Sequence, residues 1–304
     1  METRLLPFDD DAIAEGARLI ALGETVAIAT ETVYGLAADA TNADAVTRIY
    51  EAKGRPSFNP LIVHVPSHAE ADRIAEVGPL SSRLAEQHWP GPLTVVAPLR
   101  KDSGIASLVT AGLPTIALRV PAHPAMRALL QASKHPLAAP SANASGTISP
   151  TRAEHVMRSL GGRIPLVIDA GPSPGGIEST IVGEIGGQLR LLRHGPVEIA
   201  GAEVVTGGRI EAPGQLSSHY APNKPLRLGA YTAEPDEYLM GFGKVAGDTN
   251  LSPSGSLREA AARLFDLLHV ADQSPKARIA VAPVPVHGLG AAINDRLKRA
   301  VSPS

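Results

Sequence analysis

The stretch YEAKGRPSFNPLIVHV, residues 50–65, contains the transition that decides the fold. An amphipathic segment over residues 42–53 ends at Gly54, and a Pro-rich turn then leads into the apolar run of residues 61–65. Asn42 is a typical helix N-cap, and Gly54 is typical of the position that follows a helix. The stretch therefore predicts a helix that passes through a turn into a buried strand, as in α/β proteins.

The same alternation of apolar runs and amphipathic segments extends to both sides of this stretch. Further strands are predicted over residues 25–29, 93–99, 115–120, 136–140, 166–170, 179–182 and 189–193. Further helices are predicted over residues 9–22, 67–77, 79–88, 123–133 and 151–160. Strands mixed with helices at this spacing predict an α/β domain over residues 1–203.

The pattern stops over residues 204–225, which are rich in Gly, Pro and Ser and have no useful helical or strand period. We interpret them as a linker, and a loop of this length is usually functional or disordered. Strand and helix patterns return over residues 226–304, with the clearest helix over 256–271. This last part predicts a second, smaller α/β unit of the doubly wound type.

Composition excludes several classes of function. The net charge of −2 shows no basic excess that would demand nucleic acid as a partner. The absence of cysteine excludes disulfides, thiolate metal sites and cysteine nucleophiles. Acidic residues 9–11 stand where a signal peptide would be apolar, and no run reaches the roughly 18 apolar residues of a membrane span. We expect a cytoplasmic protein that does not associate with membranes.

Common catalytic motifs are also missing. The sequence contains no G-x-x-x-x-G-K-[ST] phosphate loop, no H-E-x-x-H metal motif and no G-x-S-x-G nucleophile elbow. We predict no metal-ligating residues and assign no general base.

Two cations flank the helix end of the opening stretch. Lys53 and Arg55 could simply complement the negative end of the helix dipole. They could also bind a phosphate or carboxylate, since Arg suits bidentate oxyanion contacts and Lys a point charge. Asn59 could fix a ligand or only the turn. His64 lies among apolar neighbours, where a satisfied core histidine is the more common reading.

Polar groups follow at least three other strands. Hydroxyls and a carboxylate occur over residues 30–32, Ser and Asn side chains over 139–151, and Ser, Thr and Arg over 176–196. Each group alone could be ordinary turn chemistry. Together they are the expected layout of a cleft that binds a polar, phosphorylated ligand at strand ends. Such groups position a substrate and stabilise charge, which is what phosphoryl or nucleotidyl transfer mainly needs.

These residues also occur in a recognisable order. The segments TETVYGLAADA, KGRPSFNPLIVHV, WPGPLT, LRVP, PSANASG, EST and RHGP resemble, in this order, the threonylcarbamoyl-AMP synthase family of the YrdC type. The later segments APGQLSSHYAP and GLGAAINDRLKRA resemble its longer members, which carry a linker and a C-terminal domain. The similarity covers essentially the whole chain.

The resemblance implies a fold and a reaction. The catalytic domain would be a twisted mixed sheet whose helices form a large concave cleft, followed by a small Rossmann-like C-terminal domain. The enzyme would condense L-threonine, bicarbonate and ATP, with Mg²⁺, to threonylcarbamoyl-AMP and pyrophosphate. The product would serve tRNA threonylcarbamoyl-transfer proteins, and weak tRNA binding is possible. The alternatives are an RNA-binding module of this fold without synthase activity and a carbamoyl-transfer domain of a larger maturation enzyme.

The resemblance also implies roles for individual residues. Lys53 and Arg55 would be catalytic. The residues that would bind the nucleotide are Arg55, Asn59, Thr115, Asn143, Thr151, Arg193 and Tyr220. The residues that would bind threonine are Thr32, His64, Arg119, Ser141 and Ser179. Arg119 would pair with the amino acid's carboxylate, and residues 204–225 would form a lid. This linker reads GQLSS ahead of HYAP, where longer members often have Lys and Arg.

Overall fold

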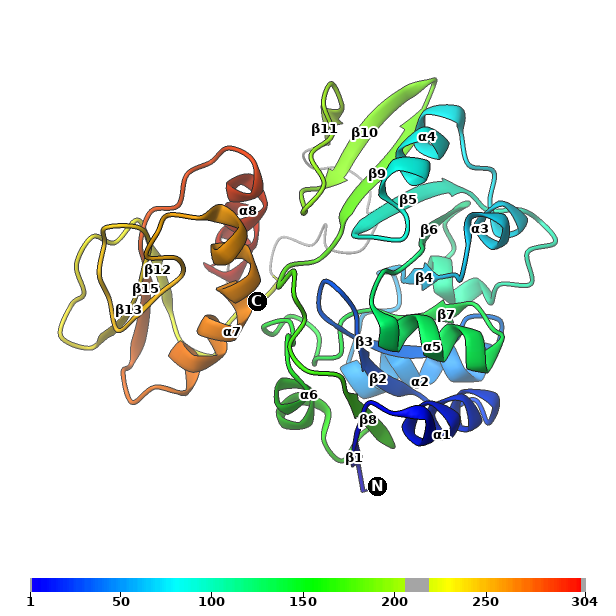
Figure 1. The fold of residues 1–304 in the computed structure, drawn as a ribbon, viewed down its shortest axis with the longest axis horizontal. Helices are drawn as coiled ribbons and strands as arrows, with labels where there is room; N and C mark the ends of the chain where they lie inside the picture. The colour runs from blue at the N-terminus through cyan, green and yellow to red at the C-terminus, as the bar shows by residue number, and fades with distance from the viewer. Residues whose placement is uncertain (1, 206–218, 302–304) are drawn as a thin grey trace.

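A mixed sheet of eleven strands organises the N-terminal part of the chain, in the order β1-β8-β2-β3-β7-β4-β6-β5-β9-β10-β11 (Figure 1). The computed structural model describes residues 2–205 and 219–301. The strands are β1 (Arg4–Pro7), β2 (Val26–Ala29), β3 (Tyr34–Asp39), β4 (Ile62–His64), β5 (Leu93–Pro98), β6 (Thr115–Arg119), β7 (Leu137–Ala138), β8 (Leu166–Asp169), β9 (Thr180–Ile185), β10 (Gln188–Arg193) and β11 (Glu203–Val204). Parallel pairs such as β4/β6 and antiparallel pairs such as β2/β3 both occur, so the predicted mixed α/β sheet is confirmed.

Helices cover the two faces of this sheet unequally. They are α1 (Asp10–Ala21), α2 (Ala43–Lys53), α3 (His68–Ile74), α4 (Pro79–His88), the 3₁₀ turn η1 (Ser107–Thr110), α5 (Pro124–Ser133) and α6 (Ala153–Leu160). On one face, α1 and α5 pack over Ile28, Leu137 and Ile168. On the opposite face, α2, α4 and α6 share the largest apolar core with Val63, Leu118 and Val167.

The face under α1 and α5 continues beyond these helices onto β4, β6, β5, β9 and β10. Successive strand residues alternate between faces, so Ile62 and His64 share this face with their β6 partners Ala117 and Arg119. A small apolar cluster lies there, formed by Ile62, Val96, Ala117, Ile181 and Leu192. Its members all come from strands in the part of the chain that the structure describes. This stretch of the sheet is therefore available for a site.

The C-terminal domain is a second sheet with helices on one side. The strands β12 (Leu226–Leu228), β13 (Glu237–Gly241), β14 (Thr249–Asn250) and β15 (Arg278–Val281) pair in parallel in the order β12-β15-β13-β14. The helices α7 (Leu257–Gln273) and α8 (Leu289–Val301) lie between this sheet and the larger domain (Figure 1). The predicted small α/β unit is confirmed, but both of its described helices lie on one side of the sheet and not on both sides, as the doubly wound type would have them.

The two domains share one apolar core. Val33, Ile148 and Ile177 of the larger domain cluster with residues of α7 and α8, among them Phe265 and Ile293. The C-terminal domain is thus packed onto the sheet domain rather than attached only through the linker. No helix among the residues that the structure describes has the length and apolar character needed to cross a membrane.

Four strands are missing from the sequence-based prediction. The longest is β3, whose residues, YGLAAD, lie between the predicted strand over residues 25–29 and the predicted helix over 42–53, where no element was assigned. Every residue of β3 is buried, and the strand pairs with both β2 and β7. Strands β1, β11 and β14 have only two to four residues each. Such short strands depend on a neighbouring strand and have little periodicity of their own.

Candidate active site

Arg55 shapes the loop that follows α2 by donating hydrogen bonds to carbonyl groups of the same loop. Gly54 ends the helix with φ +58°, a conformation that favours glycine. Arg55 then folds back, and its Nε and Nη2 donate to the carbonyls of Asn59 and Pro60 at 3.1 and 2.8 Å. Burial lowers the pKa of Arg55 to about 10, so the guanidinium stays charged at neutral pH. The result is a fixed positive charge in the loop that leads into β4.

Lys53 points at a different loop. Its Nζ donates to the carbonyls of Ser141 and Asn143, and its own carbonyl accepts from the Ser145 amide at 2.8 Å. Burial, and then repulsion by Arg55, holds the pKa of Lys53 well below its usual range. In this structure Lys53 pins the loop that carries Ser141 to the end of α2.

Asn59 and His64 are buried polar groups without partners. The Asn59 side chain is fully buried, and neither amide atom has a hydrogen-bond partner among the described residues. The same holds for both ring nitrogens of His64. Burial, and then the charge of Arg119, lowers the pKa of His64 to about 3, so the ring is neutral. Buried polar groups are nearly always satisfied, so these two indicate a place for a ligand or water.

Arg119 already has an acidic partner. Its Nη2 lies 2.6 Å from Glu31 Oε1, and its Nη1 donates to Thr32 Oγ1 at 3.0 Å. Burial alone would raise the pKa of Glu31, but the charge and hydrogen bonds of Arg119 outweigh it and lower the pKa to about 2. Glu31 is a residue to which the sequence-based prediction gave no role. The sequence feature that could have identified Glu31 is its position in TET, between two threonines at the end of β2.

Arg193 reaches the same face through a bulge in β10. The register shifts between Leu191 and Arg193, so Arg193 lies opposite Ile181, which belongs to the apolar cluster of the open face. Such a bulge re-aims a side chain that strict alternation would turn to the other face. Arg193 Nε and Nη2 then donate to the Ser179 carbonyl and hydroxyl, both at 3.0 Å.

Tyr220 approaches the site from the segment that follows residues 206–218. It is 1% exposed, has φ +65°, and packs its ring against His219 and Phe265. Its hydroxyl has no partner among the described residues. Most of the predicted lid, residues 206–218, lies outside the described residues.

These elements enclose one cavity with an empty volume of about 560 Å³, including its opening to solvent. The predicted site residues that line it are Thr32, Arg55, His64, Arg119, Ser141, Arg193 and Tyr220. Three of them are arginines, and Glu178 is the one acidic residue among the described lining residues. The cavity therefore suits an anion.

Six predicted site residues lie outside this lining: Lys53, Asn59, Thr115, Asn143, Thr151 and Ser179. Asn59 and Ser179 each neighbour a lining residue. The Asn59 carbonyl accepts a hydrogen bond from Arg55, and the Ser179 carbonyl accepts one from Arg193. Asn143 donates through Nδ2 to the Thr147 carbonyl at 2.8 Å, and thus fixes its own loop. Thr115 is the first residue of β6 and lies on the same face of the sheet as Arg119, four residues before it in the strand. Thr151 is buried beside His155.

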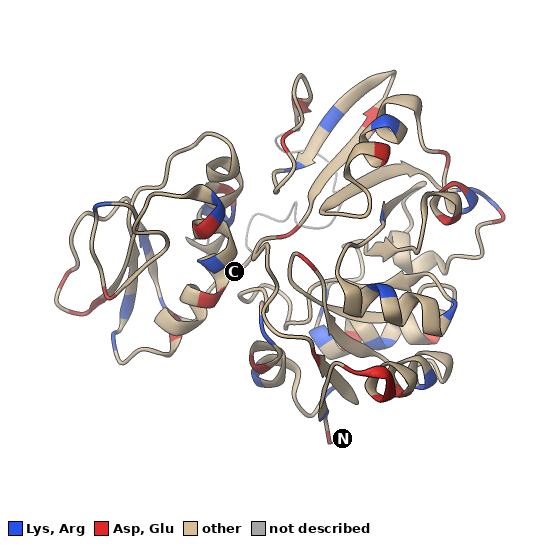
Figure 2. Cartoon of the chain, viewed as in Figure 1, with Lys and Arg blue, Asp and Glu red and all other residues tan. Residues whose placement is uncertain are grey.

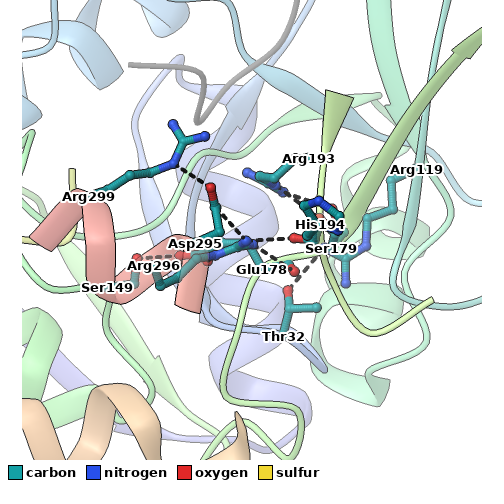
Figure 3. A network of polar contacts seen from close by, with 10 residues as sticks. All are labelled: Thr32, Arg119, Ser149, Glu178, Ser179, Arg193, His194, Asp295, Arg296 and Arg299. Atoms are coloured by element: carbon teal, nitrogen blue, oxygen red, sulfur yellow. Dashed lines mark hydrogen bonds and ion pairs between the residues drawn. The ribbon is translucent and has the colours of Figure 1, made fainter. Parts of the chain in front are cut away.

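Two further charged residues at the site were not predicted. Glu178 lines the cavity and stands in the GIEST segment next to Ser179, and Arg296, which contacts Glu178 but is not among the described lining residues, comes from α8 of the C-terminal domain. Arg296 Nε lies 3.0 Å from Glu178 Oε2 across 118 residues of sequence. Figure 3 shows this pair beside Arg193 and Ser179. No local pattern marks a contact between residues so far apart in the sequence.

Comparison with known proteins agrees with this architecture. A family model described as telomere recombination matches residues 18–195, and one described as the threonylcarbamoyl-AMP synthase C-terminal domain matches residues 188–302. The chain is 38% identical to a threonylcarbamoyl-AMP synthase of Bacillus subtilis, covering 97% of this chain and 94% of the relative. It is 35% identical to one of Pyrococcus abyssi, over 93% and 92% of the two chains.

Solved structures give the same result. A crystal structure of P. abyssi Sua5 complexed with L-threonine matches with a TM-score of 0.90 and 33% identity, over 98% of each chain. Escherichia coli YciO matches with a TM-score of 0.57 and 17% identity, over 65% of this chain and 98% of its own, and shares the fold alone. The matches extend through both domains, and the chain belongs to the threonylcarbamoyl-AMP synthase family.

Proposed function

We propose that this chain is an L-threonylcarbamoyladenylate synthase, which converts L-threonine, bicarbonate and ATP to threonylcarbamoyl-AMP and pyrophosphate. One observation carries the proposal beyond family membership. Arg55 from the loop after α2 and Arg119 and Arg193 from the ends of β6 and β10 converge on one cavity, beside His64 and Tyr220, whose polar side-chain atoms have no partner among the described residues. Fixed charges and unpaired polar groups in a site shielded from water suit a transfer reaction on phosphates.

We assign the residues around the cavity to two substrates. Arg55, Arg193 and Tyr220 would contact the nucleotide, with Asn59 behind Arg55. Thr32, His64, Arg119 and Ser141 would hold threonine. The threonine carboxylate would share Arg119 with Glu31, which already lies 2.6 Å away.

The proposed reaction has two steps. The neutral threonine amine and bicarbonate give a carbamate and water. A carbamate oxygen then attacks the α-phosphorus of ATP, and the bond to pyrophosphate breaks. The arginines stabilise the charge that develops on the phosphates. Mg²⁺ would enter bound to ATP and offset phosphate charge.

The product is a mixed anhydride, which water hydrolyses easily, so the enclosure of the cavity has a chemical use. Such a product needs an acceptor close by. We place the chain in the cytoplasm, where it would supply proteins that transfer the threonylcarbamoyl group to tRNA adenosine next to the anticodon. Basic and acidic residues are interspersed along both domains in Figure 2, which gives little support to RNA binding as the main function.

Pyrophosphate release from ATP tests the proposal. We expect release to require both L-threonine and bicarbonate, and Arg55→Ala to reduce turnover roughly 100-fold. The replacement of a surface arginine such as Arg73, which is paired with Glu70 on its own helix, provides the matched control. Release without threonine, or equal release with L-serine, would refute the assignment.

A further inference from the structure

A guanidinium from the C-terminal domain is buried at the back of the active site. Arg296 of α8 has no exposed surface and is the largest fully buried side chain among the described residues. Its Nη1 donates to the His194 carbonyl at 2.6 Å, and its Nη2 to the Glu178 carbonyl at 3.3 Å. Its Nε faces the Glu178 carboxylate, which also accepts from Ser149 Oγ at 2.5 Å.

These contacts join the two segments that carry cavity residues. Glu178 and His194 are the chain neighbours of Ser179 and Arg193, which are hydrogen-bonded to each other. Arg296 thus holds both segments from behind, as Figure 3 shows. Its guanidinium carbon also lies 5.6 Å from the centre of the Tyr220 ring, within the range of a cation–π contact.

Stability alone is a weak reason for such a group. A buried ion pair often contributes no more than apolar residues of similar volume would, because both charges must lose their water. The surrounding interface is already apolar, with Phe265, Ile293 and Ile177 fully buried. A planar fork with donors in fixed directions gives orientation, which apolar packing does not.

We propose that Arg296 is a positioning residue, through which the C-terminal domain holds Arg193, Ser179 and Tyr220 in the geometry that ATP requires. The proposal rests on the proposed function for its ligand. Lysine at position 296 would keep a charge opposite Glu178, but one ammonium group cannot reach all four acceptor atoms, on Glu178, His194 and Asp295, that the fork reaches. The nucleotide contacts would lose their alignment while the charge balance stays intact.

The test is the KM for ATP in pyrophosphate release by the full chain at saturating threonine and bicarbonate. We expect Arg296→Lys to raise this KM at least about tenfold. The matched control is Arg152→Lys, because Arg152 also crosses the domain interface, to Asp266 at 2.7 Å, but its side-chain hydrogen bonds among the described residues go to Asp266 and not to Glu178 or His194. The control should keep the KM of the unaltered chain.

A purely structural role gives a different result. Loss of correctly folded protein lowers the apparent kcat and leaves the KM for ATP unchanged. If Arg296→Lys does not fold, Arg296→Gln, which leaves the cavity residue Glu178 unchanged, should show the same rise. A KM within twofold of the unaltered chain in the folded variant overturns the proposal.

The two proposals can fail separately. If the unaltered chain releases no pyrophosphate with threonine and bicarbonate, the proposed function fails. Calorimetric titration with a non-hydrolysable ATP analogue then decides the role of Arg296. An affinity at least about tenfold weaker in Arg296→Lys than in Arg152→Lys supports positioning of a nucleotide site. Equal affinities overturn it.

Discussion

At the scale of single residues, the site is marked by polar groups that the fold buries without satisfying them. The Asn59 amide, both nitrogens of His64 and the Tyr220 hydroxyl have no partner among the described residues. An unsatisfied buried group costs about 1–3 kcal/mol. His64 and Tyr220 line the same cavity, so a ligand bound there would remove the cost at both of them together, whereas Asn59 lies behind Arg55 and outside the described lining.

This interpretation can be tested by removing the hydroxyl oxygen of Tyr220. Tyr220→Phe removes a hydroxyl that has no described partner, so we expect the thermal midpoint to stay the same or rise slightly. The KM for ATP should rise about threefold to tenfold, the value of one hydrogen bond. Steady-state pyrophosphate release and thermal unfolding measure the two effects.

Tyr50 is the matched control for this substitution. Its hydroxyl donates to the Asn59 carbonyl at 2.9 Å and lies 3.1 Å from the Leu108 carbonyl. Tyr50→Phe should therefore cost roughly 1 kcal/mol of stability and lower the thermal midpoint. If Tyr220→Phe destabilises the chain as much as Tyr50→Phe does, the Tyr220 hydroxyl is a structural group.

At the scale of elements, β10 has a glycine beside each end, and the one that follows the strand lies next to the site. Gly187 lies in the hairpin before the strand, with φ +75° and open space around it. Gly195 follows the strand, and a Cβ there would lie 2.2 Å from the Thr180 amide nitrogen. The approach of Gly195 to the backbone of β9 keeps Arg193 close to Ser179.

Alanine at these two glycines should therefore have different effects. Gly187→Ala strains a left-handed residue and should cost about 1 kcal/mol, with activity kept. Gly195→Ala must displace backbone atoms, so we expect a larger loss of stability and a kcat/KM at least about tenfold lower. Denaturant unfolding and pyrophosphate release compare the two variants. Equal losses in both would show that the Gly195 approach does not position the site.

The contact between α6 and α7 makes stability depend on pH. His155 and His269 stack across the domain interface, with ring centres 3.8 Å apart. Burial, and then repulsion by His269, lowers the pKa of His155 to about 3. Burial lowers the pKa of His269 to about 4. Asp266 opposes both shifts. Both pKa values lie below the ordinary 6.5, so the unfolded chain binds more protons between about pH 4 and 6.5, and stability falls as the pH falls through this range.

His155→Gln should reduce this pH dependence. Each histidine held neutral contributes up to about 1.4 kcal/mol for each pH unit below 6.5. The free energy of unfolding, measured at pH 7.5 and 5.0, should therefore change less in the variant than in the unaltered chain. The exposed His287 provides the control, and His287→Gln should leave the difference as it is. The same difference in both variants would contradict the role of the stacked pair.

The elements that the sequence predicted well are those with a clear period and clear caps. The predicted helix over residues 42–53 is α2, and the Asn42 side chain accepts from the amides of Asp44 and Ala45 as an N-cap should. The missed strand β3 consists mostly of small residues that fit a loop equally well. The cavity residues at strand ends were also identified, because strand ends can be located from the sequence. The partners of these residues were not, since Glu31 and Glu178 act through contacts with distant arginines.

At the scale of the whole molecule, the two domains are one structural unit. Their shared core contains Ile148 and Ile177 of the larger domain and Leu268 of α7, all buried. Arg296 and the pair of Arg152 with Asp266 add polar links across the same interface. A boundary of this kind could not be predicted from the sequence, where the linker suggested two separate modules. The chemistry that needs Tyr220 and Arg296 therefore depends on the C-terminal domain remaining in place.

A single tryptophan reports whether the domains unfold together. Trp89, the only tryptophan of the chain, is buried in the core of the larger domain. Leu268→Ala, in the C-terminal domain, should cost about 2–5 kcal/mol because it leaves a cavity in the shared core. If unfolding is cooperative, this change should move the Trp89 fluorescence transition in denaturant to the same extent as the circular-dichroism transition. Val270→Ala, at a position on the same helix that is 45% exposed, should move neither. A Trp89 midpoint that stays fixed in Leu268→Ala would show that the larger domain holds its structure without the smaller one.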